Sequence, residues 1–271
     1  MKLTNKLLEA ITAFILILPQ KIIGDVVLSK SVMDLSLDSA LMSIEAYKAH
    51  PKNITGFHYV KNFIEEEDQV LISKKDGYCF VAFRGTSLTV ADWHQNFKLG
   101  FKLVCNENFY TCCQTRRGFY DAYYHPSYLR ELEDKMLECY DSCENKDECI
   151  VFTGHSQGGA IASVAGVKHS DLNPYVITFG EPASVKPDCE AISSHRWYRY
   201  VNTIETKKLG SGISYDPIPF APGFGTIVYG HFIILGADDK HVSYIGLDST
   251  KSFSPVRQIQ LSQFRIFFSH L

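Results

Sequence analysis

Apolar and polar positions in the first third of the chain predict one helix and one β-hairpin. From Leu37 to His50 the apolar residues recur at helical spacing, and Pro51 ends the pattern. Two runs rich in β-forming residues follow, Gln69 to Ser73 and Tyr78 to Phe83. Between them stands Asp76-Gly77, a pair typical of tight hairpin turns. We therefore expect a helix followed by two antiparallel strands.

The middle of the chain predicts helices and strands in alternation. Pro126 to Cys143 has an apolar stripe on one helical face and charged residues on the other. The short apolar run Ile150 to Phe152 precedes small residues at helical spacing, Gly158 to Ala165. Tyr175 to Phe179 and Trp197 to Val201 are further apolar strands. This order is typical of α/β proteins with a mostly parallel sheet, helices on both faces and a ligand site beyond the carboxyl ends of the strands.

A Gly-x-Ser-x-Gly motif, Gly154-His155-Ser156-Gln157-Gly158, stands between the predicted strand and helix. Such a turn strains the backbone of the serine and exposes its hydroxyl, and the two glycines remove Cβ atoms that would collide. The free N–H groups at the start of the helix face developing negative charge. The bare pattern arises by chance in roughly one chain in ten of this length, so the strand and helix around it carry the prediction. We predict that Ser156 is a nucleophile.

A nucleophilic serine needs a histidine to take its proton and a carboxylate to orient that histidine. In this kind of fold the acid and then the histidine follow the serine along the chain. Spacing alone does not choose among the candidates. The acids in predicted loops are Glu181, Asp188, Glu190, Glu205, Asp216, Asp238, Asp239 and Asp248, and the histidines are His169, His195, His231, His241 and His270.

Length, composition and net charge limit the classes of protein to which the chain can belong. A chain of 271 residues with 45% hydrophobic residues suits one large α/β domain or two small ones. Its formal net charge of −3 comes from interspersed acids and bases, so no basic stripe predicts nucleic-acid binding. Lys2 and Lys6 precede the apolar run Ala10 to Leu18, and residue 24 is a glycine. We expect a cleaved secretory signal over 1–24 and a single domain over 25–271; an uncleaved anchor and an amphipathic helix are the alternatives.

The eight cysteines predict disulfides if the chain is secreted. No Cys-x-x-Cys pair occurs, so a zinc site is not expected. Cys105 with Cys112 or Cys113, and Cys143 with Cys149, are the short loop closures that spacing favours. Free buried thiols are the alternative. A long cysteine-bearing loop is predicted before Arg117.

Several motifs occur in one order along the chain, and the set resembles the class 3 lipases, the fungal triacylglycerol lipase family. The resemblance spans about Leu37 to Leu247 and implies an α/β-hydrolase fold with no metal or organic cofactor. One departure is Pro182-Ala183-Ser184-Val185, where the family usually has Pro-Arg-Val-Gly. The motifs are Phe83-Arg84-Gly85-Thr86, Asp92-Trp93, Arg117-Gly118-Phe119, Gly154-His155-Ser156-Gln157-Gly158-Gly159-Ala160 and Thr178-Phe179-Gly180-Glu181-Pro182.

The resemblance also implies an acid and a base for Ser156. The family's aspartate opens an Asp-x-x-Pro-x-x-Pro segment, which Asp216 opens here, and its histidine opens a His-x-x-Tyr-x-Gly segment, which His241 opens here. Two rivals remain. Glu205 falls on the acid position if the chain is aligned without a gap. His231 is the rival base, although a structural histidine is the commoner explanation in its β-rich surroundings.

Further roles follow from the same resemblance. It implies the backbone N–H of Thr86, with its hydroxyl, and the N–H of Gln157 as oxyanion donors. It also implies a short helical lid at about Leu88 to Phe101, in which Trp93 contacts the site or the substrate; a plain core anchor is the alternative for Trp93.

These observations predict a secreted serine carboxylic-ester hydrolase that acts on acylglycerols, with a lipid or other ester as its substrate, possible contact with a lipid–water interface, and no nucleic acid or stable protein partner. An esterase of smaller or aromatic esters, such as feruloylated sugars, is the second hypothesis. A non-catalytic relative that binds lipid or a surface partner is the third.

Overall fold

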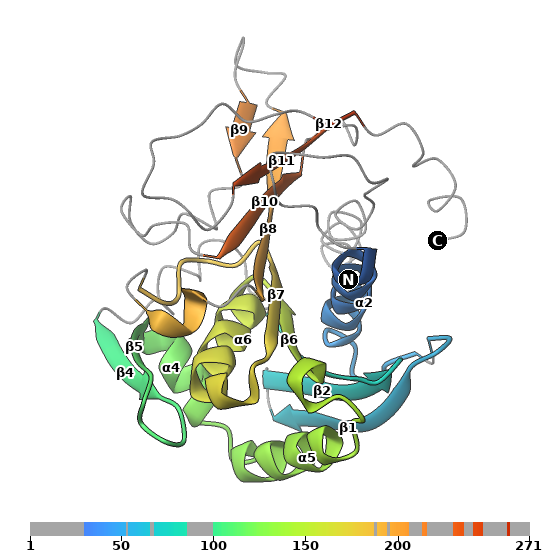
Figure 1. Cartoon of the computed structure of the whole chain (residues 1–271), viewed down its shortest axis with the longest axis vertical. Helices are drawn as coiled ribbons and strands as arrows, with labels where there is room; N and C mark the ends of the chain where they lie inside the picture. The colour runs from blue at the N-terminus through green and yellow to red at the C-terminus, as the bar shows by residue number, and fades with distance from the viewer. Residues whose placement is uncertain are drawn as a thin grey trace.

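Figure 1 shows a computed structural model of the chain. The fold is organised around one large, mostly parallel sheet. It describes residues 30–52, 54–65, 68–85, 100–186, 189–193, 196–205, 213–215, 230–235, 241–245 and 259–260. The described strands of the large sheet run in the order β1-β2-β3-β6-β7-β8-β10-β11-β12, with β9 paired to β8. β4 and β5 form a separate two-stranded sheet.

The elements alternate along the chain as the sequence predicted. The strands are β1 (His58–Glu65), β2 (Asp68–Lys75), β3 (Tyr78–Phe83), β4 (Phe101–Cys105), β5 (Cys112–Arg116), β6 (Ile150–His155), β7 (Tyr175–Phe179), β8 (Trp197–Glu205), β9 (Ile213–Tyr215), β10 (His231–Leu235), β11 (His241–Ile245) and β12 (Ile259–Gln260). The α-helices are α2 (Lys30–Glu45), α4 (Arg117–Tyr124), α5 (Leu129–Asp141) and α6 (Gln157–Lys168), and the 3-10 helices are η1 (Lys146–Glu148), η2 (Ser170–Leu172) and η3 (Glu190–Ser193).

The central strands β3, β6, β7, β8 and β10 are parallel, and the strands at both ends of the sheet pair antiparallel. Their side chains alternate between two cores. On one face α2 packs through Leu35 and Met42 against Phe80. On the other face α4, α5 and α6 cover the sheet, where Met136 joins the core of Val81. Helices therefore cover both faces, as predicted, and none in the described part of the chain is long and apolar enough to cross a membrane.

The predicted hairpin is confirmed, whereas the bounds of two helices differ from the prediction. Asp76 and Gly77 both have positive φ, 50° and 83°, as a tight two-residue turn requires. α2 begins before Leu37 and ends at Glu45, because the chain tightens into a turn in which the Tyr47 N–H donates to the Ile44 carbonyl at 3.1 Å. α5 begins only at Leu129, after a turn that opens at Pro126.

The stretch predicted as a long loop contains a hairpin instead. β4 and β5 pair antiparallel from Phe101 opposite Arg116 to Cys105 opposite Cys112. Its outer face exposes Phe101 and Leu103, so the usual alternation of apolar and polar residues does not mark the first strand. The hairpin packs along the segment after β7, where the Arg116 N–H donates to the Ser184 carbonyl at 2.8 Å.

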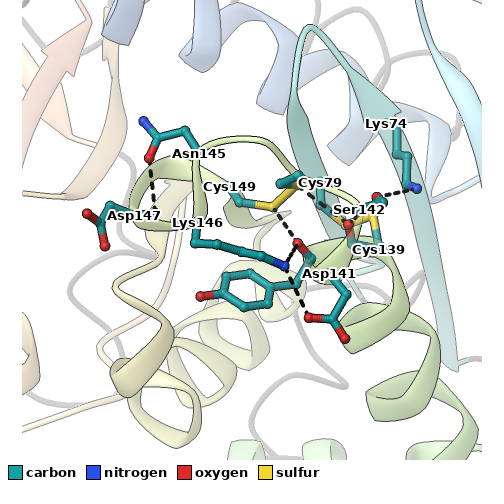
Figure 2. Close-up of a disulfide and its surroundings, with 11 residues drawn as sticks. Lys74, Cys79, Cys139, Asp141, Ser142, Asn145, Lys146, Asp147 and Cys149 are labelled. Atoms are coloured by element: carbon teal, nitrogen blue, oxygen red, sulfur yellow. Dashed lines mark hydrogen bonds and ion pairs between the residues drawn. A yellow bond between two sulfur atoms is a disulfide. The ribbon is translucent and has the colours of Figure 1, made fainter.

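All eight cysteines form disulfides. Cys105–Cys112 and Cys143–Cys149 are the two short closures that spacing favoured. The long-range pairs are Cys79–Cys139 and Cys113–Cys189. Figure 2 shows the first long-range pair, which fastens the end of α5 to the start of β3, with Cys149 next to Cys79. Four disulfides are typical of proteins from oxidising compartments.

Removing the Cys79–Cys139 disulfide by paired serine substitutions is expected to lower the free energy of unfolding by about 4 kcal/mol, because its closure spans many residues. The sequence separation is 60 for this pair and 6 for Cys143–Cys149. The same change at Cys143–Cys149 is expected to cost only about 2 kcal/mol on the same loop-closure scale. Urea unfolding of both double variants without reductant measures this. Equal losses would contradict the loop-closure explanation.

Candidate active site

Ser156 occupies a strained turn between β6 and α6. Its φ is 59° and its ψ is −128°, a conformation that costs a residue with a side chain of order 1–3 kcal/mol. The Ser156 N–H donates to the Phe179 carbonyl of β7 at 2.8 Å, which fixes the turn to the neighbouring strand. The predicted strand, sharp turn and helix are thereby confirmed. The residue as a whole is buried, with 5% of its surface exposed.

The two glycines of the motif allow β6, α6 and β3 to approach closely. A Cβ on Gly154 would collide with the Gly158 backbone, and a Cβ on Gly158 would collide with the Phe83 carbonyl. Side chains at either position would therefore push the helix away from the sheet. This close packing brings the start of α6 against the end of β3.

The residues predicted as oxyanion donors follow two segments that lie close to Ser156. Gln157 is the first residue of α6, where an N–H has no partner within the helix and the positive end of the helix dipole lies. The turn after β3 lies on the other side, because a Cβ on Gly85 would lie 3.3 Å from the Ser156 Cβ. Thr86, the next residue, lies outside the described residues, as does Trp93.

The sheet register places the predicted base at the edge where Ser156 lies. Ser156 follows the carboxyl end of β6. β11 runs antiparallel to β10 with Val242 opposite Leu235, so its first residue, His241, stands at the carboxyl end of β10. The His241 side chain and all of Asp216 lie outside what the structure describes. Asp216 is the next residue after Tyr215, which ends β9.

The alternative acid, Glu205, and the alternative base, His231, lie at opposite edges of the large sheet. Glu205 ends β8, where it pairs with Ile213 of β9, so its backbone stands at the carboxyl edge. His231 pairs with Tyr198 at the amino ends of β10 and β8, away from Ser156. The His231 ring is buried and stacks on Tyr198 with 4.8 Å between ring centroids and 16° between planes. His231 therefore has a structural position, which the sequence also favoured.

Glu181 cannot serve as the acid, because its carboxylate is occupied by structural bonds. The hydroxyls of Ser163, Thr178 and Ser184 donate to it at 2.7, 2.6 and 2.6 Å. The Arg199 Nε donates to it at 3.1 Å, and the side chains of Glu181 and Arg199 are 0% and 3% exposed. The cluster joins α6, β7 and β8 beneath the site.

The side chain of His155, the residue before the serine, has a structural partner. Its Nδ1 lies 3.0 Å from the hydroxyl of Tyr47. Burial lowers the pKa of the His155 imidazole to about 4, so the ring is neutral at pH 7. Sequence reasoning missed Tyr47 and Arg199. Tyr47 belongs to no sequence motif, and Arg199 lies within a strand that was predicted from its apolar residues.

Comparison with protein families gives one match. The model of the family described as Lipase (class 3) matches residues 80–222, which is more than half of the chain. The matched range includes the oxyanion turn, the serine motif and the Asp216 segment. A search of curated protein sequences found no match.

Solved structures with similar folds include lipases of two fungi. The Rhizomucor miehei triacylglyceride lipase is 17% identical, with a TM-score of 0.59 over 81% of this chain and 86% of that one. Lipase II of Rhizopus niveus is also 17% identical, with a TM-score of 0.59 over 84% and 87%. A propeptide complex of a deletion mutant of the Rhizomucor miehei lipase is 19% identical with a TM-score of 0.52; the match covers 74% of this chain but only 61% of that one. These likenesses confirm the α/β-hydrolase fold.

Proposed function

The chain belongs to the class 3 lipase family and is a carboxylic ester hydrolase of the lipase type, and we propose that it cleaves acylglycerol esters through an acyl-enzyme on Ser156. The observation that carries this proposal is the strained Ser156 backbone at the start of α6, with φ of 59°. Such strain at a strand–helix turn is maintained where a nucleophile must be presented. The similar structures named as triacylglycerol lipases support the substrate class.

The proposed reaction uses Ser156, His241 and Asp216. The Ser156 Oγ forms a bond to the ester carbonyl carbon while His241 takes its proton and Asp216 holds the imidazole in the required tautomer. The carbonyl π electrons move to oxygen and return when the C–O bond to the alcohol breaks, and the alcohol leaves with the proton from His241. Water then hydrolyses the acyl-enzyme by the same steps. Chain order and the carboxyl-edge position of His241 support these roles.

The developing negative charge on the carbonyl oxygen is proposed to be held by Gln157 and Thr86. The Gln157 N–H opens α6, and Thr86 follows Gly85, whose backbone lies beside Ser156. One such donor is worth about 3–4 kcal/mol of transition-state stabilisation in comparable sites. Because the charge is stabilised by N–H groups and the helix dipole, the proposal needs no metal or organic cofactor.

A lid over the serine is also proposed, at about Leu88 to Phe101 with Trp93 on its apolar face. The burial of Ser156 supports it, since the residue is only 5% exposed. A few large apolar side chains, each worth about 1.5–3 kcal/mol when buried, suffice to make opening depend on a lipid surface. Secretion, with residues 1–24 as the signal, is proposed because the four disulfides need an oxidising compartment.

A panel of esters tests this function. Hydrolysis is expected to be faster for emulsified long-chain acylglycerols than for short soluble or feruloyl esters, and to rise sharply as each acylglycerol passes its solubility limit. Trp93→Ala is expected to weaken that rise, because the apolar lid face loses its largest side chain. Rates are measured against substrate concentration through the solubility limit. A smooth hyperbola with a preference for small soluble esters would favour the esterase hypothesis.

A further inference from the structure

Tyr47 lies behind the nucleophile, at the point where three segments meet. It follows α2, and its hydroxyl lies 3.0 Å from the His155 Nδ1. The same hydroxyl lies against the backbone of Gly85, because a Cβ on that glycine would collide with it. One hydroxyl therefore touches both turns that build the site.

The Tyr47 hydroxyl and the His155 Nδ1 share one hydrogen bond, in which the tautomer of the imidazole decides which group donates. Burial raises the pKa of the Tyr47 phenol well above its usual value, so the proton stays on the oxygen. The chain of contacts runs from the Gly85 backbone through the Tyr47 hydroxyl to His155.

Both ends of this chain are next to residues of the proposed site. His155 directly precedes Ser156, and Gly85 directly precedes Thr86. The two turns are also in contact, since a Cβ on Gly85 would lie 2.5 Å from the His155 carbonyl oxygen. The Arg84 guanidinium lies over the Tyr47 ring, 6.0 Å from its centroid. A shift at either turn would change the distance between nucleophile and oxyanion donor.

We propose that Tyr47 is a positioning residue that locks the nucleophile turn and the oxyanion turn into one unit. The inference rests on the proposed function, because it assumes that Ser156 and Thr86 act on the same carbonyl group. Tyr47 touches neither the substrate nor the reacting atoms. It acts through His155 and Gly85, by holding Ser156 and the oxyanion donor at the spacing that the transition state requires.

Tyr47→Phe is expected to lower kcat by about 10- to 100-fold and to leave KM within about twofold, because displacements of about 1 Å in a catalytic constellation have effects of that size. The rate constant for labelling of Ser156 by a phosphonate ester should fall in parallel. The matched control is Tyr200→Phe, since the Tyr200 hydroxyl also contacts α2, at 2.8 Å from the Ser36 Oγ. That variant should lose similar thermal stability but less than about twofold in kcat.

A double-mutant cycle with His155→Leu separates positioning from general support of the fold. Both changes break the same chain of contacts. The kcat of the double variant should therefore lie no more than about twofold below that of the less active single variant. The inference would be overturned if the losses of kcat in the two single variants multiplied in the double variant. A kcat within about twofold of wild type in Tyr47→Phe would also overturn it, as would an equal loss of kcat in Tyr200→Phe. Wild-type protein that a phosphonate fails to label at Ser156 would instead overturn the proposed function, and this inference with it.

Discussion

The Ser156→Ala variant is expected to lose ester hydrolysis by at least about four orders of magnitude in kcat while its fold is retained, because removal of a triad nucleophile costs several decades of rate. Alanine keeps the Cβ and can occupy the same turn, in which the Ser156 N–H is bonded to Phe179. The residual rate would come from the oxyanion donors and from substrate binding. The measurement is kcat on a soluble ester, together with thermal unfolding and the stoichiometry of phosphonate labelling.

Ser39→Ala is the matched control for that experiment. Ser39 is fully buried in α2, and its hydroxyl donates to the Leu35 carbonyl at 2.7 Å. The control therefore removes a buried serine hydroxyl without touching the β6–α6 turn, and its kcat should stay near that of wild type. If Ser156→Ala kept more than about a hundredth of the wild-type kcat, Ser156 would not be the nucleophile.

The central part of the fold could be predicted because its strands and helices have strong local patterns. β6 and β7 are buried on both faces and are therefore continuous apolar runs. The Asp76-Gly77 pair predicts the β2–β3 hairpin, because these two residue types favour the positive φ angles of a tight turn. β4 and β5 were missed because Phe101 and Leu103 face outward and the hairpin depends on packing against a segment far along the chain.

Residues that act through distant contacts could not be predicted from the sequence. The Tyr47 and His155 side chains meet across 108 residues of chain, and no local pattern specifies such a contact. The same holds for the Cys79–Cys139 and Cys113–Cys189 disulfides, because eight cysteines allow about 105 pairings that sequence alone does not distinguish.

Ser156 was recognisable because one short segment contains the strand, the turn and the helix that present it. Its partners have no such local signature. Asp216 and His241 were selected by resemblance to a family and remain predictions. The register supports His241 by placing it at the carboxyl edge of the sheet, and it places His231 at the opposite edge.

The Glu181→Gln variant is expected to lower the free energy of unfolding by about 3–5 kcal/mol, because it removes the charge of the carboxylate that is paired with the buried Arg199 guanidinium. Both side chains are almost fully buried, and the glutamate also accepts the hydroxyls of Ser163, Thr178 and Ser184. An amide has one acceptor oxygen and an N–H₂ group in place of the second, so it cannot accept all of these bonds. Chemical denaturation at neutral pH measures the loss.

The exposed ion pair between Lys61 and Glu131 provides the control for that prediction. Its nitrogen and oxygen are 2.8 Å apart, a little closer than in the buried pair, but its side chains are 42% and 53% exposed. Glu131→Gln should therefore cost no more than about 1 kcal/mol, since water screens the charges and solvates the lysine that remains. Similar losses in the two variants would contradict the argument that burial, rather than the ion pair alone, makes Glu181 essential. A large loss only at Glu181 would show that this carboxylate holds α6, β7 and β8 together beneath Ser156.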